Sequence, residues 1–325
     1  MEIGGKNIDV GVFLQSMSSS DIYYCPNPGN AGDSAIATAT YQLFDRVGLR
    51  YHCVGWDEDF DSEGKSIVYG GGGNLTDNYL HARTFIERHH AEAERFIMLP
   101  HTVQGNSDLL RDLGPNVYLF CRERRSFEWV REHAGDSSVY LDHDVAFRLD
   151  PDTVLEEPFT GAEAIKTVSN SLARSVPNSL MMRLGIDSDI TGPTLPLRKA
   201  ARASKDVLST LTGSKSVLYA LRTDKERTVS SPPSSNVDVS RVFSYGTTPP
   251  LTAKRATVGM LSFFDCYERV VTNRLHGCIL AALLGKEVDF YANNYFKNRE
   301  VYLHSIEGQF PNVRWCGEWE EKTDK

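Results

Sequence analysis

The first half of the chain repeats one pattern: a short apolar run, a glycine-rich or polar turn, and then a segment with helical periodicity. Apolar runs of strand length occur at residues 22–26, 51–56, 66–74, 96–101, 117–123 and 139–144. Strands that alternate with helices at this spacing form βα units and a parallel sheet. Because ligands of parallel sheets bind where the strands end, the residues after each run are the candidates for a site.

The patterning changes twice along the 325 residues, a length that suits two domains. Strand–helix alternation fills residues 1–150, strand-like runs are absent from 151–215, and strand–helix patterns return in 216–325. The sequence therefore predicts an amino-terminal α/β domain, a helical crossover between domains, and a carboxy-terminal α/β domain. In the last of these we expect a strand at 242–246 and a helix over 253–264.

Composition and charge exclude several kinds of function. The chain carries 35 basic and 43 acidic side chains, and the net charge of −8 argues against a nucleic-acid-binding surface spread over the protein. The six cysteines lack CxxC spacing, so neither a zinc site nor a disulfide framework is expected. The amino end lacks the basic and apolar segments of a signal peptide, and no apolar run is as long as a membrane span. We therefore expect a cytoplasmic protein without a transmembrane segment, and peripheral attachment to a membrane stays open.

The stretch Val270–Val288 combines a strand, a polar turn and an apolar helix. Its turn places Arg274 and His276 where the carboxyl end of a strand meets the amino end of a helix, and the free N–H groups and helix dipole there suit an anion. An arginine adds a planar cationic group for carboxylate or phosphate, and a histidine can move a proton near neutral pH. The stretch therefore predicts an anion site with a proton-transfer group beside it.

Glycine-rich and polar turns follow two strands of the first domain. Asn30 and Asp33 lie in NPGNAGDSAI, which is either a ligand-binding loop or a turn that caps the next helix. The segment GGGGN, which ends with Gly72, Gly73 and Asn74, lets a substrate approach the backbone closely, and the alternative is a flexible turn. Neither segment has the spacing of a nucleotide P-loop or of a dinucleotide-binding fingerprint.

Charged side chains and a histidine follow three further strands. His101 ends the fourth strand, on the same sheet edge as the two glycine turns, although an isolated histidine is more often structural. Arg122 ends the next strand, and Arg124 and Arg125 begin the helix after it, where an anionic ligand would offset cations that the helix dipole disfavours. The alternative for the three arginines is a solvated basic face. Asp144 follows the sixth strand, with too few potential ligands nearby to indicate a metal.

The second domain offers a comparable set of cations. Arg222 follows the strand VLYAL, and Asn294 and Lys297 follow the strand VDFYA. In a parallel sheet these ends lie on the edge that carries Arg274. We therefore expect Arg222, Arg274 and Lys297 on one rim, the alternative for Lys297 being an ordinary surface lysine.

Several of these stretches together resemble the polysaccharide pyruvyltransferase family. The matching segments are GNAGDSAI, GGGGNLTDNY, LPHTVQG, CRERRSF, DHDVAF, TNRLHGCILAALLGKEV and NNYFKNREVY. Their order and spacing cover the chain from about Ile22 to Tyr302. The most specific part of the likeness is TNRLHG ahead of an apolar helix, together with GGGGN and GNAGD in register.

The resemblance implies an α/β fold of two Rossmann-like domains facing a cleft, as in GT-B glycosyltransferases. It also implies transfer of the enolpyruvyl carbon skeleton of phosphoenolpyruvate to a sugar, usually as a cyclic pyruvate ketal across two hydroxyls. Donor binding is then expected from Arg274, Leu275, Arg122, Asn74, Gly72 and Gly73. The CRERRSF segment leaves the choice of donor arginine open among Arg122, Arg124 and Arg125.

The chemistry of phosphoenolpyruvate fits these residue types. Its carboxylate and phosphate need two cationic anchors and N–H donors. Addition at C2 needs an acid to protonate the methylene carbon and a base for the sugar hydroxyl, and cations help phosphate to leave. We expect His276 to bind phosphate or act as the acid, and His101 to act as acid or base. Contacts to the acceptor, or support for the donor side chains, are expected from Asn30, Asp33, Asp144, Arg222, Asn294 and Lys297. No cofactor and no metal is expected.

Two other functions stay open at this point. One is a nucleotide-sugar glycosyltransferase of GT-B architecture, which would bind a UDP- or GDP-sugar and not phosphoenolpyruvate. The other is a non-catalytic carbohydrate-binding or scaffold protein that shares the fold. The sequence does not specify the acceptor sugar, its linkage or its attachment to a lipid, and the loops 57–65 and 223–240 are candidates for acceptor contacts.

Overall fold

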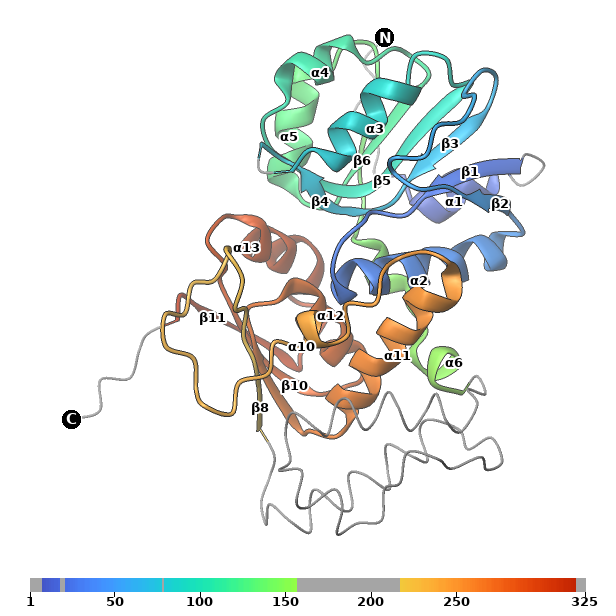
Figure 1. Ribbon diagram of the computed structural model, residues 1–325. Helices are drawn as coiled ribbons and strands as arrows, with labels where there is room; N and C mark the ends of the chain where they lie inside the picture. The colour runs from blue at the N-terminus through green and yellow to red at the C-terminus, as the bar shows by residue number, and fades with distance from the viewer. Residues whose placement is uncertain (1–7, 18–20, 78, 157–216, 320–325) are drawn as a thin grey trace. The chain divides into compact units, whose positions relative to one another are not determined.

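The computed structural model describes residues 8–17, 21–77, 79–156 and 217–319, which belong to two compact units (Figure 1). Unit 1 comprises Met1–Leu149, Gly246–Ala253 and Arg299–Glu307, and unit 2 comprises Asp150–Tyr245, Lys254–Asn298 and Gly308–Lys325. Each unit is built around its own parallel sheet, which confirms the predicted α/β fold with parallel strands. Most of the predicted helical crossover, residues 157–215, lies outside the described residues.

Seven parallel strands form the sheet of unit 1. They are β1 (Asp21–Cys25), β2 (Arg50–Cys53), β3 (Ser66–Tyr69), β4 (Gly72–Leu75), β5 (Arg95–Val103), β6 (Val117–Cys121) and β7 (Ser138–Leu141). Their order is β2-β1-β3-β5-β6-β7, and β4 pairs with the last part of β5. The order reverses between β1 and β3, and doubly wound sheets bind ligands beyond the carboxyl ends of strands at such a switch point.

Helices cover both faces of this sheet. They are α1 (Val10–Gln15), α2 (Ala31–Val47), α3 (His81–His89), α4 (Ser107–Asp112), α5 (Arg124–His133) and the short 3-10 helix η1 (Val145–Arg148). Phe85 of α3 belongs to an apolar cluster that α4, α5 and one face of the strands share. On the other face, the ring of Phe13 in α1 contacts Phe120, and Phe44 in α2 contacts Tyr24. A sheet buried on both faces needs continuous apolar strands, which is why the runs in the sequence show little alternation.

Four parallel strands form the sheet of unit 2, in the order β11-β10-β9-β8. They are β8 (Val217–Ala220), β9 (Arg269–Thr272), β10 (Glu287–Tyr291) and β11 (Val313–Gly317). The remaining helical segments are α6 (Pro151–Glu156), α10 (Val239–Val242), α11 (Pro250–Asp265), α12 (Leu275–Leu283), α13 (Lys297–Val301) and the π-helical η2 (Tyr302–Ile306). The almost wholly buried α12 follows β9 directly and packs on β9 and β10. Its amino end therefore lies at the edge where the strands end.

Two elements of unit 2 differ from the sequence expectations. The strand expected at 242–246 is wrong, because Val239–Val242 is helical and Phe243 is buried beside α11. A Cβ placed on Gly259 of α11 would lie 2.4 Å from the Phe243 ring, so the aromatic side chain fills the space that this glycine leaves. A short apolar run can anchor a loop as readily as it can form a buried strand, and periodicity does not separate the two. The strand β11 was also not expected, whereas the helix expected at 253–264 is confirmed as α11.

Candidate functional site

The turn after β1 lies at the switch point of the unit 1 sheet. Asn30 caps α2, and its side chain accepts a hydrogen bond of 2.8 Å from the Gly32 N–H. The Asp33 carboxylate accepts one hydrogen bond of 2.9 Å from the Asn30 N–H and another of 2.7 Å from Nδ2 of Asn27. The capping geometry that the sequence allowed is therefore present, and it fixes Asn30 and Asp33 at the edge where ligands of this fold bind.

The glycines of GGGGN allow three segments of unit 1 to meet. A Cβ on Gly70 would lie 2.5 Å from the backbone nitrogen of Asn27, just beyond β1. A Cβ on Gly73 would lie 2.7 Å from Nη2 of Arg122, just beyond β6. Gly72 has a φ of 148°, which residues with a side chain rarely adopt. The glycines therefore first of all permit close packing at the sheet edge.

Buried polar side chains connect these two turns to His101. The Tyr69 hydroxyl donates to Oδ1 of Asn27 over 3.2 Å and accepts from Nδ2 of Asn74 over 3.0 Å. The backbone N–H of Asn74 donates to Nε2 of His101 over 3.0 Å. Asn74 and His101, which the sequence singled out separately, are therefore direct neighbours.

His101 is completely buried in β5, two residues before the strand ends. Its Nδ1 makes no hydrogen bond of ordinary geometry within the described part of the chain. Burial, followed by the charge of Arg122, lowers the pKa of His101 to about 3, and the opposing effects of the Gly70 carbonyl and the Asp144 carboxylate are smaller. The ring is therefore neutral near pH 7, and its Nε2 acts as a hydrogen-bond acceptor.

Arg122 forms a buried ion pair with Asp144. Its Nη1 donates to the Asp144 carboxylate over 2.6 Å and its Nε donates to Oγ1 of Thr102 over 2.9 Å. The two charged side chains are 1% and 0% exposed. Asp144 also accepts a hydrogen bond from the Ala146 N–H, which fixes the carboxylate at the start of η1. The remaining Nη2 lies beside Gly73.

The three arginines of CRERRSF differ sharply in burial. Arg124 and Arg125 are exposed at the start of α5, whereas Arg122 is enclosed at the sheet edge. Between them, Glu123 is fully buried and caps α5 by accepting hydrogen bonds from the backbone and hydroxyl of Ser126. Burial raises the pKa of Glu123 against the effect of these hydrogen bonds. The structure thus distinguishes Arg122 from its neighbours by burial, and its role in binding the donor stays a prediction.

In unit 2, Arg274 occupies the N-cap position of α12, and the predicted strand, turn and helix are confirmed. Its Nε and Nη2 donate to the two oxygens of Asp238 over 2.9 and 2.6 Å. The same Nη2 lies 2.9 Å from Asp224. Arg274 is only 4% exposed. The guanidinium group, which the sequence assigns to an external anion, therefore contacts two carboxylates of its own chain.

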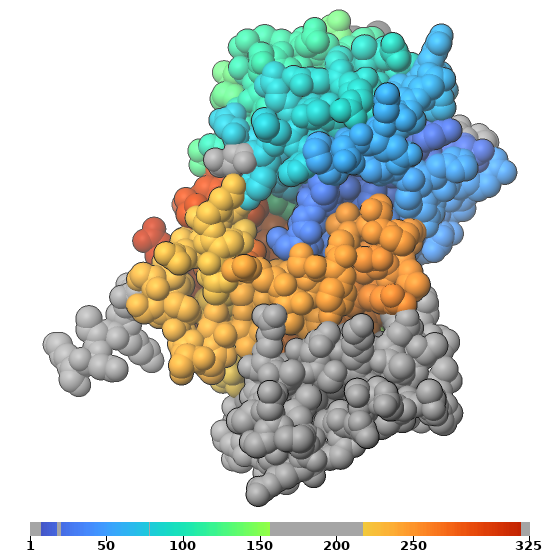
Figure 2. Space-filling view, in the orientation of Figure 1, coloured from blue at the N-terminus to red at the C-terminus, as the bar shows by residue number. Residues whose placement is uncertain are grey.

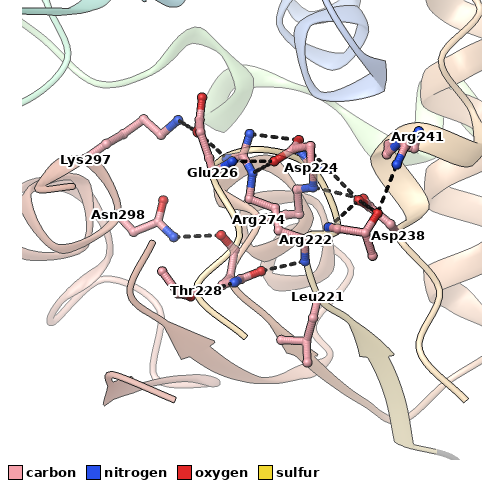
Figure 3. A network of polar contacts seen from close by, with 12 residues as sticks. Leu221, Arg222, Asp224, Glu226, Thr228, Asp238, Arg241, Arg274, Lys297 and Asn298 are labelled. Carbon is pink, nitrogen blue, oxygen red and sulfur yellow. Dashed lines mark hydrogen bonds and ion pairs between the residues drawn. The ribbon is translucent and has the colours of Figure 1, made fainter. Parts of the chain in front are cut away.

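Arg222, Arg274 and Lys297 belong to one network, but carboxylates lie between them (Figure 3). Arg222 donates from Nε to Asp224 over 2.8 Å, and its Nη1 lies 2.7 Å from Glu226. Nζ of Lys297 lies 3.6 Å from the same Glu226. The three cations thus gather on one rim, as the sequence predicts, within an alternating arrangement of charges.

The other predicted residues of unit 2 differ in burial. Leu275 is buried as the first residue of α12, His276 follows it and is partly exposed, and Asn294 is exposed in the turn after β10. The fully buried Asn298 donates from Nδ2 to the carbonyl of Asn273 over 2.8 Å. This hydrogen bond links the start of α13 to the turn that carries Arg274.

The sequence analysis did not identify the carboxylates that hold the arginines of unit 2. Asp224, Glu226 and Asp238 lie in the loop 223–240, whose composition indicates only a polar connection. A usable signal is charge pairing, because a buried arginine at the end of a core strand requires a carboxylate partner. The loop 223–240, which follows β8 in the sequence, is the nearest polar segment that contains such carboxylates. Asn27 and Tyr69 were missed in the same way, since each resembles an ordinary strand-end or core residue.

The arrangement suits the binding of anions. Each unit holds buried arginine at the carboxyl ends of parallel strands, and in unit 2 this position coincides with the amino end of α12. Among the described residues, no group of three or more His, Cys, Asp or Glu side chains has a geometry that could hold a metal ion.

Comparison with known proteins agrees with this assessment. The family description "Polysaccharide pyruvyl transferase" matches residues 30–295. The Bacillus subtilis (strain 168) protein named "Putative pyruvyl transferase EpsO" is 24% identical over 318 residues, which cover 91% of this chain and 88% of that protein. The crystal structure of KP1_0663 from Klebsiella pneumoniae subsp. pneumoniae NTUH-K2044, described as a functional uncharacterized protein, is similar with a TM-score of 0.69 and 28% identity, covering 96% of this chain and 97% of that one. Because the family match spans most of the sequence and includes the strand-end motifs described above, the chain belongs to the polysaccharide pyruvyl transferase family.

Proposed function

We propose that this protein moves the pyruvyl group of phosphoenolpyruvate onto hydroxyls of a sugar in a polysaccharide, forms a pyruvate ketal and releases phosphate. Membership of the family supports pyruvyl transfer to a polysaccharide. The observation that carries the choice of donor is the position of Arg274, at the amino end of α12 and in one network with Arg222 and Lys297. A donor with both a phosphate and a carboxylate needs several cations and N–H groups in one place.

The reaction divides into two additions at C2 of the donor. A general acid protonates the methylene carbon, and the first sugar hydroxyl attacks the resulting C2 cation while a base takes its proton. The C–O bond to phosphate then breaks, phosphate leaves with the electron pair, and the second hydroxyl closes the ketal as it loses its own proton. Cations stabilise the charge that develops on the departing phosphate.

The described geometry supports an assignment of these tasks. We assign Arg274, with Leu275 beside it, and Arg122 to the donor anions. His276 is assigned to phosphate binding or to the acid, because it is partly exposed in the first turn of α12. His101, whose ring is neutral near pH 7, is assigned to the base or to a hydrogen-bond acceptor.

The remaining assignments concern support and the acceptor. Asp144 is assigned to holding Arg122, because its carboxylate is buried against that guanidinium group. Gly72, Gly73 and Asn74 are assigned to the donor side of unit 1. Contacts to the saccharide acceptor are assigned to Asn30, Asp33 and Asn294.

We further propose that the two units serve as the two Rossmann-like domains that face a cleft in GT-B-like enzymes, so that both cationic sets act on one donor. No cofactor is part of the proposal. The acceptor is a polysaccharide or its lipid-linked precursor. None of the described helices combines the length and the apolar character that crossing a bilayer requires. A reducing, cytoplasmic setting is proposed because all six cysteines are free.

The direct test is incubation of the protein with phosphoenolpyruvate and a panel of galactosides, glucosides and mannosides. We expect phosphate release that depends on both donor and acceptor, together with a gain in acceptor mass that matches a pyruvate ketal. Arg274→Ala should remove most of the activity, whereas it would leave the function of a non-catalytic scaffold protein intact. Phosphate release without modification of any acceptor would contradict the proposal.

A further inference from the structure

Asp224 bridges Arg274, which is assigned to the donor, and Arg222 of the same network (Figure 3). Its carboxylate accepts hydrogen bonds of 2.8 and 3.2 Å from Nε and Nη2 of Arg222. One of the same oxygens lies 2.9 Å from Nη2 of Arg274. A carboxylate held by two guanidinium groups is the arrangement expected of an anionic ligand in such a site.

The charges of the six ion-paired side chains of the network cancel. Arg222, Arg274 and Lys297 contribute three positive charges, and Asp224, Glu226 and Asp238 contribute three negative charges, so that these six side chains sum to zero. A phosphate ester that also carries a carboxylate would bring at least two further negative charges. Such a ligand gains strong attraction only if one of the carboxylates moves away from the arginines.

The three carboxylates are not equally able to move. The Asp238 side chain is 6% exposed and also accepts hydrogen bonds of 2.9 Å from the backbone N–H and the hydroxyl of Thr223. The Asp224 side chain is 29% exposed, and among the described residues its one hydrogen bond outside the arginines is a 3.1 Å contact from the Glu226 N–H two residues along the chain. The segment after β8 that carries Asp224 forms part of the molecular surface in Figure 2. The Glu226 side chain is 11% exposed and contacts both Arg222 and Lys297. Asp224 is therefore the most exposed of the three carboxylates and the one that can leave with a local change of its loop.

Protonation does not remove the Asp224 charge near neutral pH. Burial alone would raise the pKa of Asp224, but the hydrogen bonds from Arg222 and the charge of Arg274 outweigh burial and lower it. The side chain is thus ionised whenever the arginines are close, and a ligand has to displace it as an anion.

We propose that Asp224 is an internal substitute for the anionic donor: it occupies Arg222 and Arg274 when the site is empty and is displaced when a phosphate- or carboxylate-bearing ligand binds. This inference rests on the proposed donor site of unit 2 and adds a mechanism that regulates its occupancy. An uncharged saccharide cannot replace the Asp224 carboxylate on the two guanidinium groups. Occupation of the two guanidinium groups by Asp224 therefore favours anionic ligands over uncharged ones. It also keeps Arg222 and Arg274 paired when no ligand is bound.

The test compares equilibrium binding of two probes, phosphoenolpyruvate and inorganic phosphate, to wild-type protein and to Asp224→Asn. Asparagine retains an oxygen for the Glu226 N–H and removes the charge, so both probes should bind about tenfold more tightly. Asp289→Asn is the matched control, because Asp289 in β10 also contacts two arginines, at 2.8 Å from Arg314 and 3.6 Å from Arg269. This control makes the same change in net charge outside the network and should leave both affinities unchanged.

Two more variants check the interpretation of these binding measurements. Asp224→Ser retains a hydroxyl for the loop and should also tighten binding, which covers the case in which the asparagine variant is unstable. Asp238→Asn should have the opposite effect and weaken both probes, because Asp238 positions Arg274 and does not leave it.

The outcomes separate this inference from the proposed function. If phosphate binds more tightly to the Asp224 variants but phosphoenolpyruvate never binds better than phosphate, the displacement is supported and the donor assignment is wrong. If phosphoenolpyruvate binds well to wild-type protein and the Asp224 variants bind both probes equally well or less well than wild type, the donor assignment stands and the displacement is overturned. Equal tightening by Asp289→Asn would also overturn it, since net charge alone would then explain the effect.

Discussion

At the residue scale, each arginine assigned to the donor is held by a buried aspartate. Arg122 is paired with Asp144, and Arg274 is paired with Asp238. A guanidinium group removed from water needs a carboxylate to compensate for its lost hydration, and the pair also fixes the direction of its free N–H groups. We therefore expect the proposed activity to depend also on Asp144 and Asp238, which do not themselves need to touch the donor.

The Arg122–Asp144 pair can be tested through stability. Asp144→Ala leaves the Arg122 charge buried without its carboxylate, and we expect the free energy of unfolding to fall by about 3–5 kcal/mol. Replacing both residues, as Arg122→Met with Asp144→Ala, should restore part of this loss because no unpaired charge remains. Urea unfolding of the single and double variants measures the difference. Asp144→Asn is the control for the hydrogen bond to the Ala146 N–H, since it keeps an acceptor there. If the double variant loses as much free energy of unfolding as the two single variants together, the charges of Arg122 and Asp144 are not coupled.

The buried His101 predicts a pH dependence of stability. The pKa of His101 is about 3 in the folded protein and returns to its ordinary value of 6.5 on unfolding. Between these values the unfolded chain binds a proton that the folded protein does not, so His101 makes stability fall as the pH decreases from 6.5 towards 3, by up to about 1.4 kcal/mol per pH unit.

Unfolding measurements across that pH range should show a weaker dependence for His101→Gln than for wild-type protein. Substitution of the exposed His52 by glutamine should leave the slope unchanged. A His101→Gln variant with the wild-type slope would mean that folding does not lower the pKa of His101, and it would contradict this prediction.

At the scale of elements, the connection from β3 to β4 determines how closely the strands approach one another at the switch point. Gly70 follows β3 directly and contacts the backbone beyond β1, while Gly73 leaves room for Arg122 beyond β6. The segment from Gly70 to Gly73 therefore packs closely against the chain beyond β1 and against Arg122 beyond β6. The sequence indicates a functional glycine loop here, and the structure adds a packing reason for two of its glycines.

Gly70→Ala tests this packing role. The new Cβ would lie 2.5 Å from a backbone atom, which no side-chain rotation can relieve, so we expect a loss of about 1–3 kcal/mol in the free energy of unfolding. Gly55→Ala in the same unit is the control, because its closest neighbour is a side-chain oxygen of Asp57 at 3.2 Å. Thermal or urea unfolding of the two variants measures the difference in their stability. Equal effects of the two substitutions would show that the close approach at Gly70 is not what the loop requires.

At the scale of the whole molecule, donor binding should appear as global stabilisation. A ligand that binds only the folded protein raises its stability by about 2.7 kcal/mol at a hundredfold excess over Kd. We expect phosphoenolpyruvate to raise the melting temperature and UDP- or GDP-sugars to leave it unchanged. Arg274→Ala should remove the shift, provided that the variant is folded. Stabilisation by a nucleotide sugar alone would instead support the glycosyltransferase alternative, which membership of the pyruvyl transferase family does not favour.

Much of the fold follows from the sequence because it depends on local patterns. The runs that become β1, β3, β5, β6 and β7 are apolar and end in polar or glycine turns, and α5 begins at Arg124, where the sequence predicts a helix. The strand expected at 242–246 is absent because one buried aromatic side chain, Phe243, can anchor a short apolar run without pairing to another strand. The position of Arg274 was predictable because a strand, a turn and a helix are consecutive in the chain.

By itself, the sequence determined the α/β class, the strand-end positions of the candidate residues and the gathering of Arg222, Arg274 and Lys297. These follow from periodicity and from the shared edge of parallel strands. Only the tertiary structure decided that Arg122 is buried and that its neighbours Arg124 and Arg125 are exposed. It also decided which carboxylates pair with each arginine. Such partners are far apart along the chain, 22 residues for Arg122 with Asp144 and 36 for Arg274 with Asp238, and burial forces charges to pair across distances that local patterning does not encode.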